Sequence, residues 1–168
     1  PYITGDYRIL METPELLIEG LNIVLDMFPK AKGIIGIEDN KKDAIAKVEA
    51  LVKGDARISV ATLKTKYPQG AERSLIYATT GRSINSSMLP ADAGCIVDNV
   101  ATIVAIKEAV KDGKPLYERV VTVTGDAIKN PSNFKVRTGT NVQELIEAAG
   151  GFKTQPEKII SGGPMMGM

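Results

Sequence analysis

The stretch TLKTKYPQGAERSLIYATTGR, from Thr62 to Arg82, decides how this chain folds. It starts inside an apolar run of strand length and ends in residues with helical spacing. The residues between them, Lys66 to Glu72, include Tyr, Pro, Gly and Glu, which is more than a plain turn requires. A strand that leads through such a loop into a helix is the unit from which α/β folds are built.

The residues on either side continue the same alternation. Thr13 and Pro14 open a helix whose apolar residues recur at helical spacing as far as Phe28. A strand follows, and then a helix that Asn40 is expected to cap. We therefore predict an α/β fold with a partial Rossmann-like parallel sheet, with strands at 32–38 and 56–63 and helices at 13–28, 40–51, 70–79 and 98–111.

The character of the chain changes at Asp112-Gly113-Lys114-Pro115, which indicates a domain boundary. Beyond it we expect strands at 118–123 and 134–136, a helix that Thr140 and Gln143 cap together, and a last strand at 157–163. Such an order in about fifty residues is typical of a small β-grasp-like α+β module. The predicted domains are residues 1–115 and 116–168.

The composition excludes several classes of function. The 21 basic and 20 acidic residues leave a net charge of +1, which argues against a nucleic-acid binder that depends on a strongly basic surface. The chain has no histidine, which excludes a Ser-His-Asp triad and a histidine-ligated zinc site. Its one cysteine, Cys95, cannot supply the thiolates of an iron–sulfur cluster. What remains is binding, carboxylate chemistry, or a cofactor that brings its own reactivity.

The loop from Lys66 to Glu72 is the first candidate site, because ligands of α/β sheets bind beyond the carboxyl ends of the strands and near helix N-termini. Tyr67 offers a flat face and a hydroxyl, and Gly70 lets a ligand approach the backbone. Glu72 could accept hydrogen bonds from hydroxyl or carboxamide groups. The ordinary alternatives stay open: Glu72 as a solvated acid of the first turn, and Tyr67 as a packing residue.

Asp98 and Asn99 form the second candidate, at the start of the helix predicted at 98–111. Their polar groups could meet a polar ring or a ribityl chain. Both residue types are also common helix caps, and capping alone is the explanation that the sequence favours. Arg82 could pair with a phosphate or lie exposed at a helix end.

Longer stretches of the sequence carry a resemblance. They include GIIGIEDNKKDAI from Gly33, TKYPQGAERSLIYATTGR from Thr65, LPADAGCIVDNVATIVAI from Leu89 and GKPLYERVVTVTGDAIKNPSNFKVRTGT from Gly113. On these residues the chain resembles the RnfC family, the peripheral subunit of the Rnf electron-transport complex. It is more distantly similar to the flavin-bearing NADH-binding subunit of respiratory complex I. The portion from about Leu116 resembles the ligand-binding β-grasp module called SLBB.

The resemblance implies roles for individual residues. Tyr67, Gly70 and Glu72 fall on the family's flavin and nicotinamide loop. Val97, Asp98 and Asn99 fall on a segment that lines FMN, where Asp98 stands in place of the family's asparagine. The implied cofactors of the intact subunit are FMN, NAD(H) and 4Fe-4S clusters. No catalytic residue and no metal ligand is implied within these residues.

Two family features have no counterpart in this sequence. The glycine-rich loop that cradles the flavin phosphate would precede Pro1, and the cysteine motifs for the clusters would follow the SLBB portion. Because a phosphate without its amide cradle loses several charge-assisted hydrogen bonds, we expect these 168 residues alone to bind FMN weakly or not at all.

The implied function is NADH oxidation through FMN and iron–sulfur clusters, coupled to ion translocation. The implied partners are the Rnf membrane subunits, NADH and ferredoxin, and the implied location is the cytoplasmic face of the membrane, as a peripheral subunit. Two alternatives stay open. One is a cofactor-free docking protein like the A subunit of the sodium-pumping NADH:quinone reductase, and the other is an RnfC-like cobalamin reductase.

Overall fold

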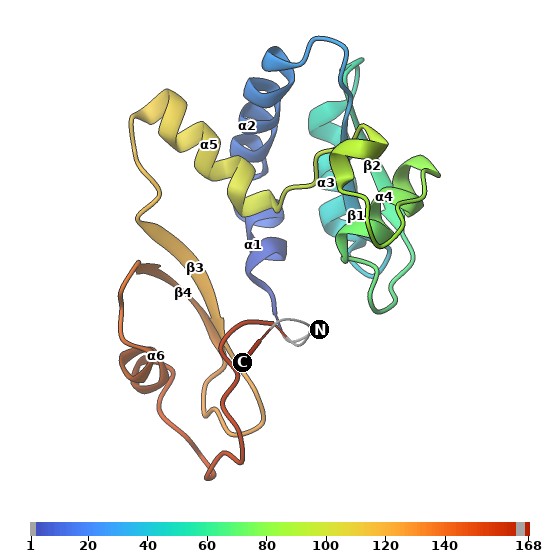
Figure 1. Ribbon diagram of the computed structural model, residues 1–168. Helices are drawn as coiled ribbons and strands as arrows, with labels where there is room; N and C mark the ends of the chain where they lie inside the picture. The colour runs from blue at the N-terminus through green and yellow to red at the C-terminus, as the bar shows by residue number, and fades with distance from the viewer. Residues whose placement is uncertain (1–2, 164–166) are drawn as a thin grey trace. The chain divides into compact units, whose positions relative to one another are not determined.

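The computed structural model describes residues 3–163 and 167–168 (Figure 1). Contacts divide them into two units, one of Tyr7–Pro115 and the other of the residues from Leu116 onward together with the short segment before Tyr7. The elements are α1 (Gly5–Glu12), α2 (Pro14–Met27), β1 (Gly33–Glu38), α3 (Lys42–Val52), β2 (Ile58–Leu63), α4 (Glu72–Thr80), the 3-10 helix η1 (Pro90–Ala93), α5 (Val100–Asp112), β3 (Glu118–Val123), β4 (Ser132–Arg137) and α6 (Val142–Ala148). The predicted α/β class is confirmed.

The first unit is built on a parallel pair of strands. β1 and β2 run side by side in a register that sets Gly33 against Ile58 and Glu38 against Leu63. Parallel strands need a crossover connection, and α3 supplies it. On β1 the side chains alternate, so that Ile35 and Ile37 are buried whereas Ile34 is 41% exposed. The strand predicted at 32–38 is therefore buried on one face only.

A single apolar core joins the helices to the buried face of β1. The residues that are most buried come from most of the long elements of the unit: Leu10, Leu17, Leu25, Ile35, Ile37, Ala44, Val48, Val52, Ile58 and Ile103. Each such leucine or isoleucine side chain contributes roughly 1.5–3 kcal/mol relative to an exposed one. The core thus unites the early helices with α5, which follows much later in the chain.

Helices α2 and α5 pack closely, as Figure 1 shows. The contact depends on Gly20, because a Cβ atom there would lie 2.2 Å from the carbonyl oxygen of Ile103. Gly20 lies in the buried stripe of α2, and Ile103 is the buried residue of α5. A glycine at this position therefore lets the two backbones approach.

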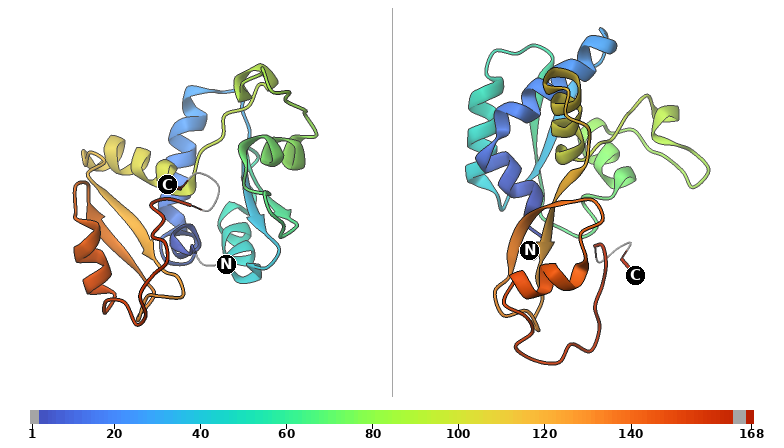
Figure 2. Two further views of the ribbon diagram at one scale, coloured as in Figure 1. Left: turned by 60° about the horizontal axis from the view of Figure 1, so that its bottom comes forward. Right: turned by 90° about the vertical axis from the view of Figure 1, so that its left-hand side faces the viewer.

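The second unit is an antiparallel pair of strands with one helix. β3 and β4 pair over their whole length, and α6 lies against them (Figure 2). A small core of Ile128, Ile146 and Ala149 holds the helix to the sheet, with Val123 and Phe134 packed around it. Within the described residues the predicted strand at 157–163 is absent, because that segment pairs with neither strand and its Ile159 and Ile160 are at least half exposed. That prediction was wrong.

At three helix starts the residues expected from the sequence form no side-chain cap. Thr13 precedes α2 but makes no capping hydrogen bond through its side chain, and Lys41 takes the N-cap position expected for Asn40. The amide oxygen of Asn40 instead accepts from the ammonium of Lys41 at 3.0 Å. In α6 the cap is Asn141, whose side chain accepts from the amide of Gln143 at 2.9 Å. Helix α1 was not predicted.

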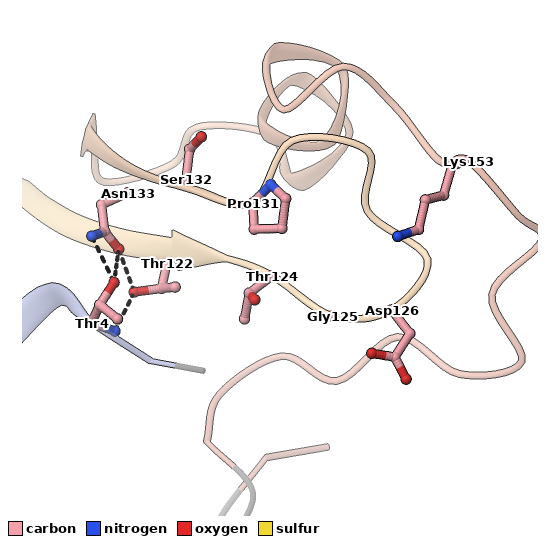
Figure 3. A pocket seen from close by; sticks show the side chains of 9 residues that line it. All are labelled: Thr4, Thr122, Thr124, Gly125, Asp126, Pro131, Ser132, Asn133 and Lys153. Atoms are coloured by element: carbon pink, nitrogen blue, oxygen red, sulfur yellow. Dashed lines mark hydrogen bonds between the residues drawn. The ribbon is translucent and has the colours of Figure 1, made fainter. Parts of the chain in front are cut away.

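A small polar cluster attaches residues 3–6 to the second unit (Figure 3). Thr122 and Asn133 stand opposite each other in the β3–β4 register, and the Thr122 hydroxyl donates to the Asn133 amide oxygen at 2.6 Å. The Asn133 amide nitrogen donates to the Thr4 hydroxyl at 2.8 Å, and the Thr4 backbone amide lies 3.4 Å from the Thr122 hydroxyl oxygen. These contacts connect segments that are far apart in the sequence.

We predict that Gly20→Ala destabilises the first unit by about 3 kcal/mol, because the added methyl forces α2 and α5 apart. Urea denaturation followed by circular dichroism measures the free energy of unfolding. Gly70→Ala is the matched control, since a Cβ there meets nothing within 4 Å and the variant should unfold like the wild type. An unchanged unfolding free energy in Gly20→Ala would contradict the described α2–α5 contact.

We predict that Asn133→Ala detaches residues 3–6 and destabilises the second unit by about 1–2 kcal/mol, because Thr4 and Thr122 lose their shared partner. Amide hydrogen exchange at Thr4 should become faster. Ser132→Ala is the control, because the Ser132 hydroxyl donates only to the nearby Asn130 carbonyl. Equal exchange at Thr4 in both variants would argue against the cluster.

Candidate functional site

The carboxyl ends of β1 and β2 lie next to each other at one edge of the sheet. The register pairs Glu38 with Leu63, and the amide of Asp39 donates to the carbonyl of Leu63 at 2.7 Å. The turn after β1 is therefore fixed to the last residue of β2, from which the loop starts. This is the edge at which ligands of open α/β sheets bind.

The side chain of Asp39 extends this attachment by two residues. Its carboxylate oxygen accepts from the hydroxyl of Thr65 at 2.7 Å and from the backbone amide of Thr65 at 3.1 Å. These two hydrogen bonds, with smaller effects of Lys64 and Lys42, hold the pKa of the Asp39 carboxyl below its ordinary value. Sequence reasoning missed Asp39, although an acid directly after a strand was a usable signal.

The loop that contains the predicted site residues is ordered by its own backbone. The amide of Gln69 donates to the carbonyl of Lys66 at 2.8 Å, and the amide of Ala71 donates to the carbonyl of Pro68 at 3.0 Å. Gln69 is only 5% exposed, whereas Tyr67 is 70% exposed. The loop thus turns one polar side chain inward and presents an aromatic ring to solvent.

Gly70 and Glu72 complete this edge. The space beside the Gly70 α-carbon is open, so its backbone is accessible to a ligand. Glu72 is the first residue of α4, and the preceding Ala71 provides no side-chain cap for the helix amides. Leu75 of α4 packs over Gly36, where an added Cβ atom would lie 3.0 Å from the Leu75 side chain. The N-terminal part of α4 therefore packs against β1.

The second predicted group precedes α5. Asn99 is the N-cap, and its side-chain oxygen accepts from the amide of Ala101 at 2.8 Å. Asp98 is exposed and Val97 is half-buried. The capping explanation is therefore confirmed for Asn99, whereas a contact of Val97, Asp98 or Asn99 with a cofactor stays a prediction.

Two arginines connect α4 with the segment that leads to these residues. Arg73 donates to carbonyl oxygens of the 85–88 turn, at 3.2 Å for Ser86. Arg82 donates to the carbonyl of Ala93 at 2.8 Å. Multiple donors in a planar guanidinium suit this bridging role. Arg82 directly follows the C-cap of α4 and is exposed, which is the exposed helix-end position considered from the sequence, and its bonds to backbone oxygens also make it a link within the unit.

The structure places the two predicted groups in one unit but does not join them directly. Tyr67 and Gly70 lie in the β2–α4 connection and Glu72 begins α4, while Val97 and Asp98 lie beyond η1. Among the residues described, no hydrogen bond runs from the first three to the last two. Their connection goes through α4, because Arg73 of α4 and Arg82 just after it hold the intervening segment.

The second unit contains a polar hollow of about 500 Å³ (Figure 3). Three of its lining residues, Thr4, Thr122 and Asn133, bond to one another as described above. Asp126 and Lys153 lie at its other end. The hydroxyl and amide groups of the hollow are thus engaged largely in holding the sheet to residues 3–6.

Membrane spans and metal-binding clusters are both absent from the described residues. In the part of the chain that the structure describes, no helix is long and apolar enough to cross a membrane. Over the same residues no three His, Cys, Asp or Glu side chains are grouped so that they could hold a metal ion.

Two protein-family models match the chain. The model described as the Nuo51 FMN-binding domain matches residues 1–108, and the SLBB domain model matches residues 120–168. The first match includes Tyr67, Gly70, Glu72 and the segment from Val97 to Asn99.

Several curated relatives are similar over nearly the whole chain. The C subunit of the Na(+)-translocating ferredoxin:NAD(+) oxidoreductase complex of Acetobacterium woodii is 48% identical over 168 residues, which are 100% of this chain and 38% of the relative. The C subunit of the proton-translocating ferredoxin:NAD(+) oxidoreductase complex of Clostridium ljungdahlii is 48% identical over 99% of this chain and 36% of the relative. The C subunit of the ion-translocating oxidoreductase complex of Cronobacter sakazakii is 40% identical over 99% of this chain and 22% of the relative. The chain therefore spans less than two fifths of these relatives, and the resemblance to RnfC is confirmed.

We predict that Asp39 and Asp43 make the stability of the first unit depend on pH in acid. The Tyr7 hydroxyl donates to Asp43 at 2.5 Å and, with the amide of Ala44, lowers the pKa of Asp43 as Thr65 lowers that of Asp39. Because both folded pKa values lie below the unfolded ones, this stabilisation is present above the unfolded value of about 4 and is lost as the pH falls through the folded values.

Urea denaturation at a series of acidic pH values checks this prediction. The wild type should lose stability more steeply below about pH 4 than the Asp39→Asn/Asp43→Asn double variant. Equal slopes in the two proteins would show that these carboxylates are not held as described.

Proposed function

The chain belongs to the family of the Nuo51 FMN-binding domain, and from this membership we propose that its first unit provides part of an FMN and NAD(H) site in an RnfC-type subunit of an ion-translocating electron-transport complex. Similarity to relatives of this type over the whole chain supports the choice of complex. We propose the domain assignment as residues 1–115 for the flavin domain and 116–168 for the SLBB module.

One observation carries the proposal: an exposed aromatic ring and an open glycine stand together at the carboxyl edge of a parallel sheet. Tyr67 is 70% exposed although its loop is ordered, and nothing occupies the space beside Gly70. An exposed tyrosine face fits a planar ring system, and an open glycine fits close approach of a ligand to the backbone. These residues fit the flavin that the family name implies.

We propose the following roles for the predicted site residues. Tyr67 contacts the ring system, Gly70 lets it approach the backbone, and Glu72 accepts hydrogen bonds from the nicotinamide nucleotide. Val97 and Asp98 line the flavin on another side, and Asn99 fixes the start of α5 through its cap. No residue of the chain is assigned to proton transfer.

The redox chemistry belongs to the cofactor. FMN, when bound, would accept a hydride from NADH and pass electrons on singly. The residues of this chain would bind and orient the two nucleotides and exclude water from between them. Iron–sulfur clusters do not fit this chain, because its one cysteine cannot provide their ligands, so other residues must hold any cluster of the complex.

The proposed partners are the other subunits of the complex, NADH, and ferredoxin acting through the complex. We propose a peripheral position on the cytoplasmic face of the membrane and a coupling of electron transfer to ion movement. The two relatives at 48% identity are described as Na(+)- and proton-translocating, so the proposal names no ion.

We predict that Gly70→Ala weakens FMN binding roughly tenfold or more while the unfolding free energy stays unchanged, because the new methyl occupies the space through which the flavin approaches. The measurement is a fluorescence titration of FMN into the intact natural protein after its flavin has been removed. Ser59→Ala, an exposed change on β2 well before its carboxyl end, is the control and should bind FMN like the wild type.

Two results would count against the proposal. Equal affinity of the wild type and Gly70→Ala would remove the loop from the flavin site. A wild type without flavin and without affinity for it would favour the cofactor-free docking protein.

A further inference from the structure

Two fixed points hold the loop between β2 and α4, and Tyr67 lies between them. The first is Thr65, which is bound through both its hydroxyl and its amide, and the second is Gln69, which is buried. Ordering a residue of a free loop costs conformational entropy. A loop that is already held in place avoids this cost when a ligand binds.

Thr65 is held by a residue from outside the loop. Asp39 belongs to the turn after β1, and its carboxylate accepts both hydrogen bonds through one oxygen. The backbone bond from Asp39 to Leu63 fixes only the end of the strand. The bonds of the Asp39 side chain therefore fix the chain two residues beyond the end of β2, at Thr65. Thr65 lies two positions before Tyr67.

Hydrogen bonding, and not charge pairing, accounts for this role. Among the described residues Asp39 forms no ion pair, although Lys42 and Lys64 are near enough to affect it. Its close partners are the neutral hydroxyl and amide of Thr65. An asparagine at this position has an oxygen that can accept the same bonds.

We propose that Asp39 is a positioning residue that orders the loop 64–71 and so holds Tyr67 ready to meet the flavin. This inference rests on the proposed function for its ligand, but the ordering of the loop is tested without any ligand. The proposal adds Asp39 to the site, although Asp39 belongs neither to the loop from Lys66 to Glu72 nor to the residues given a role above.

The first experiment measures amide hydrogen exchange in the intact natural protein without flavin. In Asp39→Ala the amides of the loop 64–71 should exchange roughly fivefold faster, the size expected for the loss of one to two hydrogen bonds. Asp39→Asn should restore slow exchange. Thr65→Val should resemble Asp39→Ala in part, because it loses the hydroxyl bond only, and Thr65→Ser should resemble the wild type.

Asp55→Ala is the matched control. Asp55 accepts from the amide of Arg57 at 2.7 Å, so it makes the same kind of bond, but before β2 begins. Its loss should speed exchange near residue 57 and leave 64–71 unchanged. Equally fast exchange of 64–71 in wild type and Asp39→Ala would overturn the proposal, as would a failure of Asp39→Asn to restore it.

The second experiment measures FMN affinity of the same variants by fluorescence titration. Asp39→Ala should bind FMN roughly fivefold more weakly, while Asp39→Asn and Asp55→Ala bind like the wild type. If Asp39→Ala binds FMN with the same affinity as the wild type, although the loop of the variant exchanges faster, the positioning role is overturned. A wild type that does not bind FMN refutes the proposed function, and the exchange data then decide the ordering role by themselves.

Discussion

Parallel pairing of β1 with β2 is the constraint on which the rest of the first unit depends. The pairing forces a crossover through α3 and brings two strand ends to one edge of the sheet. It also sets Asp39 beside Leu63, so that the turn after one strand can hold the loop after the other. Without that register, the exposed Tyr67 would belong to an unattached loop.

Glycine residues let the helices pack closely against one another and against the β1–β2 pair. Gly20 permits α5 to pack on α2, Gly33 accommodates Leu21, and Gly36 accommodates Leu75 of α4. Because α5 must return to α2, the chain between α4 and α5 has to cross the unit, and Arg73 and Arg82 hold that crossing segment. The cap of Asn99 then fixes where α5 begins. The two predicted groups of site residues are thus positioned by one set of contacts.

Local pattern was enough to predict most of this fold. The apolar runs at 32–38 and 56–63 became β1 and β2, and helical spacing found α2 through α5, because burial against one core imposes those periods. Caps were predicted less well: Thr13 and Asn40 have suitable side chains, but whether they bond is set by backbone geometry at the helix start. The strand expected at 157–163 failed because a strand needs a partner, which no local pattern reveals.

In the candidate site, too, local sequence patterns predicted some features, while others depend on contacts between distant residues. The position of Tyr67, Gly70 and Glu72 between a strand and a helix marked the loop from the sequence alone. The contact of Asp39 with Thr65 spans 26 residues and depends on strand register, so it became visible only in three dimensions. The same holds for Gly20, whose importance lies in its distance to Ile103. The sequence therefore predicted a place for a ligand, and the structure showed which contacts hold that loop in shape.

The most direct test of the central claim is a crystal structure of the intact natural protein with FMN bound. We expect the flavin ring to lie against Tyr67 and the backbone of Gly70, with Asp39 still bonded to Thr65. A flavin bound away from the β2–α4 loop, or no flavin at all in a protein saturated with it, would contradict the account.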